Sequence, residues 1–224
     1  GDGYVDRFYV GTDKGFLYRV DISDIDNPAD TVINSTERDA ERGIFGSPAI
    51  LVDGDVVRVF FGTGGDAATD ESFTYQFYAY VDGPDGVSLD WSYALDAQER
   101  VYTSAFVAAG QVYFGTTTAV SEDPCDAGGD NTGNLYVFKT KLESPDGTPA
   151  AVKKIPLPTG SGRVSPIVDD EHVYIKTTHG LLKSFGGSGY NNAAGGMASE
   201  EWGSMVHLRS WREIYCLEDD CSTP

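Results

Sequence analysis

Four short apolar runs recur along the chain, and each ends in a polar residue. Each contains three β-branched or aromatic residues, and in three of the four the next two residues are Gly-Thr. The runs occupy residues 8–12, 59–63, 112–116 and 173–177, so successive runs begin 51, 53 and 61 residues apart. Such residues favour extended strands. A period near 50 residues indicates a β-propeller or another repeat array. We call these four runs the anchor strands.

Further apolar segments flank each anchor strand. A second strand is predicted after every anchor, at residues 16–21, 77–82, 135–140 and 181–185. A strand opened by Ser-Pro or Ser-Ala is predicted before three anchors, at residues 47–52, 104–108 and 165–168. A fourth strand is predicted at residues 88–95, 152–157 and 211–215. Short turn segments link neighbouring strands as hairpins, so the repeating unit is a four-stranded antiparallel meander.

The fold class predicted from this repeat is all-β: a β-propeller or partial propeller of about four four-stranded antiparallel blades with quinoprotein-like repeats. We expect a single domain over residues 1–224, with blade units at about 1–24, 43–96, 100–158 and 163–215. The first unit contains only the second half of the pattern. Either residues 211–215 complete the first blade, or the chain is the C-terminal part of a larger propeller. The start inside an acidic loop favours the second alternative.

Composition narrows the class of partner. The formal charge is −19 with no cluster of Lys or Arg, which argues against binding to nucleic acid. No run of 18 apolar residues occurs, so we expect no membrane span. Cys216 and Cys221 are expected to form a disulfide in an oxidising compartment, which leaves Cys125 unpaired.

The first residues carry the most specific candidate chemistry. Asp2, Gly3, Tyr4 and Asp6 match the second half of a D-x-D-x-D-G-x-x-x-D calcium loop. Calcium takes six to eight oxygen ligands, and glycine permits the tight turn between them. Asp2, the carbonyl of Tyr4, and Asp6 are therefore candidate Ca²⁺ ligands. An ordinary Asp-Gly turn is the alternative interpretation.

Other polar groups give weaker signals. Acidic residues and one asparagine crowd two predicted loops and suit solvated loops or cation sites: Asp66, Asp70 and Glu71 in the first, and Asp123, Asp126, Asp130 and Asn131 in the second. His172, His179 and His207 show no spacing to a nucleophile, and no hydrolase, zinc-protease or nucleotide-binding motif occurs. The tryptophans are expected to pack between blades. We therefore expect no catalytic residue.

Three segments resemble the PilC/PilY family of type IV pilus tip-associated proteins. The opening GDGYVDRFYVGTDKGFLYRVDIS resembles its signature DGDG-x-x-D-x-x-Y-x-G-D-x-x-G-x-L-x-R-x-D. The segments at 46–49, 59–64 and 76–82 are similar to its x-P-A, V-Y-F-G-T-G and Q-x-F-Y-A-x-x-D elements. The segment 209–214, RSWREI, resembles its terminal x-S-W-R-E-L.

The resemblance implies the non-enzymatic C-terminal propeller of a large secreted protein at the pilus tip or outer membrane. Such a module supports pilus extension against retraction and takes part in adhesion, with Ca²⁺ as regulator. Its implied partners are pilin or minor pilins, the N-terminal part of the same protein, and a host or abiotic surface. Two alternatives remain: a quinone-dependent dehydrogenase fragment, and an envelope scaffold propeller that binds another protein.

Overall fold

The structure is a computed structural model. It describes residues 7–24, 26, 28–35, 42–65, 73–108, 110–118, 131–141, 149, 151, 153–160, 162–168, 172–176 and 182–186.

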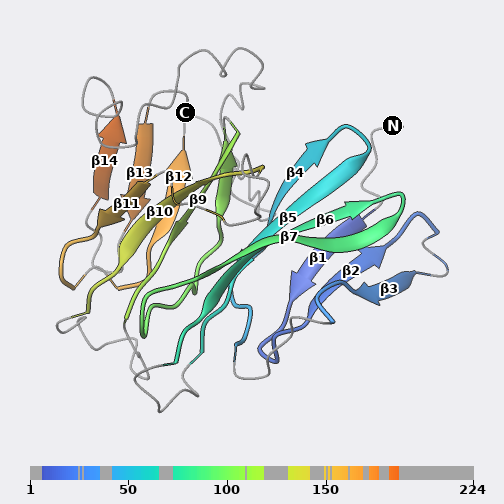
Figure 1. The fold of residues 1–224 in the computed structure, drawn as a ribbon, viewed down its shortest axis with the longest axis horizontal. Coiled ribbons are helices and arrows are strands. Elements are labelled where there is room, and N and C mark those ends of the chain that lie inside the picture. The colour runs from blue at the N-terminus through green and yellow to red at the C-terminus, as the bar shows by residue number, and fades with distance from the viewer. Residues whose placement is uncertain are drawn as a thin grey trace, which may run out of the picture.

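The described residues form four antiparallel sheets in chain order and contain no helix (Figure 1). Sheet 1 consists of β1 (Arg7–Gly11), β2 (Leu17–Asp21) and β3 (Ala29–Val32). Sheet 2 consists of β4 (Ala49–Asp53), β5 (Val56–Gly62), β6 (Gln76–Gly83) and β7 (Gly86–Ala94). Sheet 3 consists of β8 (Phe106–Ala108), β9 (Gln111–Gly115), β10 (Asn134–Lys139) and β11 (Lys153–Pro156). Sheet 4 consists of β12 (Ser165–Val168), β13 (His172–Lys176) and β14 (Leu182–Gly186).

The all-β prediction is confirmed, and each predicted strand that falls on described residues is present. The anchor strands are β1, β5, β9 and β13. Sheets 2 and 3 have the four predicted strands. Sheet 1 has three strands where the sequence predicted two, and sheet 4 has the three of its four predicted strands that fall on described residues. The sequence did not predict β3, whose four residues include only one large apolar side chain. The predicted strand at 211–215 lies outside the described residues.

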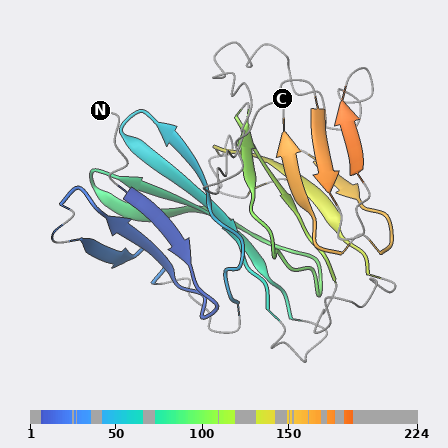
Figure 2. The same cartoon turned by 180° about the vertical axis from the view of Figure 1, so that it is seen from behind.

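The sheets pack face to face, and one apolar cluster lies between each successive pair (Figure 2). The cluster between sheets 2 and 3 is aromatic. At its centre the rings of Phe77 and Phe114 stack with their centroids 3.7 Å apart and their planes 6° apart. Trp91 lies in the same cluster and is 2% exposed, as expected for a packing tryptophan. Burial of these faces supplies most of the driving force for the stacking.

One rule of side-chain direction holds throughout the repeat. The first and third residues of the anchor strands in sheets 2, 3 and 4 face the preceding sheet, and all six are at most 2% exposed: Val59, Phe61, Val112, Phe114, Val173 and Ile175. The equivalent residues of sheet 1 are Phe8 and Val10, which are 42% and 43% exposed. The face of sheet 1 that carries Phe8 and Val10 is thus exposed, whereas the equivalent faces of sheets 2, 3 and 4 are covered by the preceding sheet.

The glycine of the Gly-Thr motif has a packing role. A Cβ added at Gly62 would lie 2.5 Å from the Val101 side chain, and one at Gly115 would lie 2.6 Å from the Val164 carbonyl oxygen. At Gly11 an added Cβ would lie 2.2 Å from Ile44. The segment that leads into the next sheet therefore crosses directly over each of these glycines, and a side chain would block it.

Small residues at the starts of β4 and β8 allow these inner strands to approach one another. A Cβ at Gly46 would lie 2.2 Å from the carbonyl oxygen of Thr103, and the backbone N–H of Ser47 donates to Ser104 Oγ at 3.1 Å. The inner strands contact one another in sequence, β4 with β8 and β8 with β12. We use the name inner strands for β4, β8 and β12.

Candidate functional site

A buried carboxylate links sheet 1 to sheet 2. Asp82 lies near the end of β6, and its side chain has no exposed surface. It accepts a hydrogen bond from Tyr9 Oη at 2.7 Å and one from Arg19 Nη1 at 2.8 Å. Arg7 Nη1 lies 4.0 Å away. A fully buried carboxylate is tolerated because charged and neutral donors both compensate its lost hydration.

The strand register places the two donors side by side. Tyr9 on β1 lies directly opposite Arg19 on β2, so both side chains leave the same face of sheet 1. Burial raises the pKa of the Tyr9 hydroxyl, and the hydrogen bond to Asp82 raises it further. Tyr9 therefore stays a neutral donor over the physiological pH range. The group acts as a clamp between two sheets.

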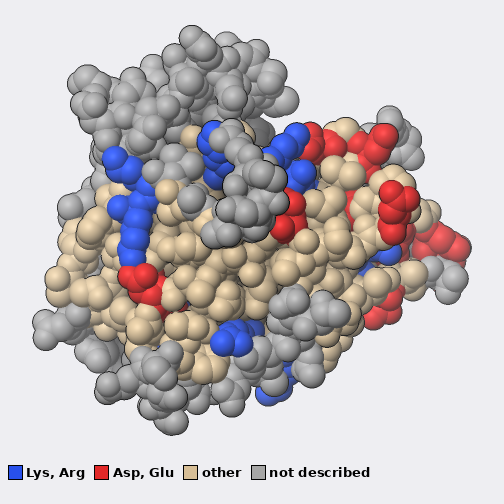
Figure 3. All heavy atoms as spheres, in the orientation of Figure 1, with Lys and Arg blue, Asp and Glu red and all other residues tan. Residues whose placement is uncertain are grey.

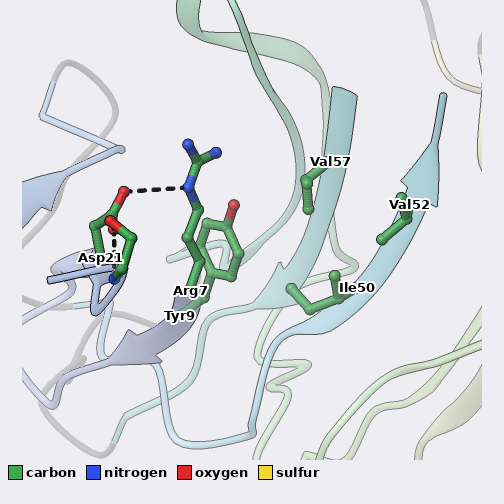
Figure 4. Close-up of a pocket in the computed structure, with 7 residues that line it drawn as sticks. Arg7, Tyr9, Asp21, Ile50, Val52 and Val57 are labelled. Atoms are coloured by element: carbon green, nitrogen blue, oxygen red, sulfur yellow. Dashed lines mark hydrogen bonds and ion pairs between the residues drawn. The ribbon is translucent and has the colours of Figure 1, made fainter. Parts of the chain in front are cut away.

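A pocket of about 430 Å³ opens between β1 and β4 beside this clamp (Figure 4). Arg7 and Tyr9 form one wall, and the apolar side chains of Ile50, Val52 and Val57 form the other. Ile50 and Val52 are 42% and 72% exposed. A ligand that fits this pocket needs an apolar part and an acceptor or negative charge for Arg7.

Arg7 is held at the mouth of the pocket by Asp21. Its Nε lies 3.4 Å from Asp21 Oδ2, and its side chain is 45% exposed. The hydroxyl and N–H of Ser23 donate to Asp21, and these hydrogen bonds hold the pKa of that carboxyl below its usual range. An exposed ion pair of this kind is weak, so Arg7 can exchange Asp21 for another carboxylate at little cost.

A second buried polar group joins sheets 2 and 3. Glu99 accepts a hydrogen bond from Tyr136 Oη at 2.7 Å and another from the Asn134 side chain. Burial and this carboxylate both raise the pKa of Tyr136. Next to Glu99, the buried guanidinium of Arg100 donates to the carbonyl oxygen of Gly65 at 2.7 Å. These side chains are largely enclosed by the protein and join sheet 2 to sheet 3.

The predicted calcium ligands lie outside the described residues. This applies to Asp2, Tyr4 and Asp6, and also to the acidic residues of the two predicted loops. Asn131, the amide residue of the second loop, is described. Among the residues that the structure describes, no group of three or more His, Cys, Asp or Glu is placed to hold a metal ion. The cysteines are likewise outside them, so the Cys216–Cys221 pairing stays a prediction. The described part of the chain contains no helix long and apolar enough to span a membrane.

The sequence did not predict the Asp82 clamp. Asp82 stands at the end of a strongly apolar strand, where it reads as a turn residue. The usable signal was the carboxylate that follows five apolar residues in a predicted buried strand, because a buried charge requires partners. Its partners Tyr9 and Arg19 are 73 and 63 residues away in the chain, so spacing alone could not pair them.

The surface carries its charge unevenly. In Figure 3 the acidic side chains gather on the side of the molecule where β1, β2 and β3 lie. Exposed carboxylates there include Asp24, Asp26 and Asp30. This agrees with the strongly negative formal charge of the chain.

Comparisons with known proteins leave the family open. No family model and no curated protein matches the chain. Among solved structures, it is similar to an oligogalacturonate lyase from Vibrio parahaemolyticus, with 11% identity and a TM-score of 0.30 over 80% of this chain and 62% of the lyase. It is also similar to oligopeptidase B from Leishmania major, with 11% identity and a TM-score of 0.31 over 84% of this chain and 32% of the peptidase. The chain thus spans less than two thirds of either protein, and likeness at this level carries no argument about activity.

Proposed function

We propose that the chain is a non-enzymatic β-propeller module of a PilC/PilY-like type IV pilus protein. In this proposal it acts at the cell surface or pilus tip, in pilus assembly and surface attachment. Its partners are pilin or minor pilins and the N-terminal part of the same protein.

The role of the signature residues carries this proposal. Tyr9 and Arg19 belong to the opening segment that resembles the family signature, and Asp82 belongs to the middle segment. These three side chains meet in the clamp between sheets 1 and 2. Two further positions of the opening segment belong to the same interface between sheets 1 and 2. Gly11 lies directly under Ile44, and Leu17 is part of the apolar cluster there. The use of these residues for packing supports a scaffold rather than an enzyme.

The proposal includes the arrangement of the four sheets as blades of a propeller. Successive blades of a propeller pack face to face with their first strands near the axis, and the inner strands β4, β8 and β12 contact one another in this order. The exposed Phe8 and Val10 face supports a preceding blade, because its equivalents in sheets 2 to 4 are all covered. We propose that this blade comes from the N-terminal part of the protein.

Calcium is proposed as a structural regulator of the segment before β1. Asp2, the Tyr4 carbonyl and Asp6 supply oxygen ligands of the type that Ca²⁺ prefers. Binding to the folded state alone would raise the unfolding temperature. The test compares thermal unfolding in millimolar Ca²⁺, in millimolar Mg²⁺ and in chelator, for the native chain and for an Asp2→Asn/Asp6→Asn variant. A native chain that melts at one temperature in all three solutions removes calcium from the proposal.

The partner assignment has its own test. The immobilised full chain is presented with purified pilin and, separately, with each minor pilin, and retention is measured at physiological salt. We expect at least one pilus subunit to be retained. Retention of none of them contradicts the pilus assignment. Turnover in a dye-linked oxidation assay after addition of quinone and Ca²⁺ would show instead that the module is an enzyme.

A further inference from the structure

Strand β1 has one free edge in the described structure. It pairs with β2 on one side, and no described strand pairs with its other side. The N–H of Thr12 donates to the carbonyl oxygen of Phe16, so every second residue counted back from Thr12 bonds to β2. In an antiparallel pair the intervening residues direct their backbone groups outward. The N–H and C=O groups of Arg7, Tyr9 and Gly11 therefore face the free edge.

In the other three sheets an inner strand pairs with the equivalent edge of the anchor strand. In sheet 2 the residues equivalent to Tyr9 and Arg7 are Phe60 and Arg58, and they pair with Ala49 and Leu51 of the inner strand β4. Sheets 3 and 4 have inner strands β8 and β12 in the same place. Sheet 1 is the only described sheet without an inner strand.

The pocket between β1 and β4 occupies the place of that strand. Its apolar wall includes Ile50, which is 42% exposed. The residue of β8 equivalent to Ile50 is Val107, which is partly buried. Val107 packs against the aromatic cluster between sheets 2 and 3, and so do Ala49 and Leu51 of the preceding inner strand, β4. Ile50 and Val52 thus form a contact surface for an inner strand that sheet 1 lacks among the described residues.

Charge complementarity specifies the occupant further. In sheet 2, Arg58 lies 3.4 Å from Asp53, the last residue of the inner strand β4. Arg7 holds the position equivalent to Arg58 at the mouth of the pocket. It forms an exposed ion pair with Asp21 at 3.4 Å and a longer contact with Asp82 at 4.0 Å. A carboxylate at the end of an incoming strand would meet Arg7 as Asp53 meets Arg58.

We propose that this slot binds an extended peptide strand from another polypeptide, which adds antiparallel to β1. The recognised segment has the pattern of the inner strands: a small residue such as Ser followed by Pro or Ala, then alternating apolar side chains, then a carboxylate. Backbone hydrogen bonds supply affinity, and the pocket and Arg7 supply specificity. This inference does not depend on the assignment to a pilus protein.

The test uses the full chain and a capped peptide with the sequence of residues 47–53, SPAILVD. Hydrogen exchange of the β1 amides and a binding titration are measured together. We expect the amides of Arg7, Tyr9 and Gly11 to exchange quickly alone and at least tenfold more slowly with saturating peptide. A peptide that ends in Asn should bind about two- to fivefold more weakly, the range of an exposed ion pair.

Substitutions in the chain test where the peptide binds. Val52→Asp, at a position 72% exposed, should weaken binding at least tenfold, whereas Ile167→Asp, at an exposed apolar position of β12, should leave it unchanged. The proposal is overturned by equal binding to the native and Val52→Asp chains, or by no protection of the β1 amides at saturation. Slow exchange of the β1 amides before peptide is added also overturns it, because the chain itself then fills the slot.

Discussion

At the scale of single residues, Asp82 shows how one buried charge can organise two sheets. Its side chain has no exposed surface and binds donors from both β1 and β2. The desolvation of the carboxylate is offset only while both donors are in place. The contribution of Asp82 is therefore tied to the docking of sheet 1 onto sheet 2.

The substitution Asp82→Asn tests this role. It keeps the side-chain shape but leaves Arg19 without its buried counter-charge, and an amide cannot accept from both donors as a carboxylate does. We expect a loss of about 1–3 kcal/mol in the free energy of unfolding, measured by urea titration. Asp30→Asn, at an exposed position of β3, is the control and should change stability by less than about 0.5 kcal/mol. Equal effects of the two substitutions would show that the clamp does not stabilise the fold.

The raised pKa of Tyr9 predicts an alkaline loss of stability. The folded chain holds the phenolic proton more tightly than the unfolded chain, in which the hydroxyl titrates near pH 10. The stabilisation is therefore complete below about pH 10 and is lost as the pH rises above it. Unfolding measured at pH 9 and pH 11 should show a smaller alkaline loss for Tyr9→Phe than for the native chain. Tyr136 has a pKa shifted in the same direction, so part of the pH dependence should remain in that variant; an unchanged pH dependence would contradict the assignment to Tyr9.

At the scale of elements, the Gly-Thr ending of the anchor strands is a crossing point. Gly11, Gly62 and Gly115 each lie under the segment that enters the next sheet. The following threonine continues this junction: the N–H of Val101 donates to the Thr63 carbonyl at 2.9 Å. The motif therefore recurs because the chain passes over the anchor strand at each of these junctions between successive sheets.

Gly62→Ala tests the crossing. The new Cβ would lie 2.5 Å from the Val101 side chain, so the crossing segment must move. Overpacking of this kind costs about 1–3 kcal/mol. Gly83→Ala is the matched control, because its Cβ would meet only Val56 Cγ1, at 3.0 Å. Chemical denaturation should show that Gly62→Ala is clearly less stable than Gly83→Ala. The reverse order would mean that the close approach of Val101 is not the reason glycine is required at position 62.

At the scale of the whole molecule, the two ends of the stack differ from its middle. Interior sheets are covered on both faces, as the clusters on either side of sheets 2 and 3 show. Sheet 1 is covered by sheet 2 on one face only, and Phe8 and Val10 remain exposed on the other. The described chain is thus an open stack of four sheets.

Truncation of equivalent residues measures this difference. Phe61→Ala removes a ring that is 2% exposed between sheets 1 and 2, and should cost about 3–5 kcal/mol. Phe8→Ala removes a ring that is 42% exposed, and should cost less than half as much in the isolated chain. The comparison is made by denaturant unfolding at equal protein concentration. If Phe8→Ala costs as much as Phe61→Ala, the face of sheet 1 is already covered in solution.

The sequence by itself determined the strands, their antiparallel order and the repeat. The reason is local: β-branched and aromatic runs separated by turn residues specify hairpins within about 10 residues of chain. The same short range explains why β3 was not predicted, because its four residues include too few apolar side chains to stand out. The predicted calcium ligands lie in residues 1–6, outside the described residues, and stay a prediction.

Only the tertiary structure decided which residues meet between sheets. Asp82 binds side chains more than 60 positions away, and no periodicity in the chain encodes that pairing. The sequence predicted no strand before the first anchor, in agreement with the described sheet 1. Only the packing showed that this edge of β1 lies beside a pocket lined by apolar side chains of β4 and β5. Local pattern specified each sheet. The packing of the sheets against one another brought the carboxylate to its donors and, among the described residues, left the edge of β1 unpaired beside an apolar wall.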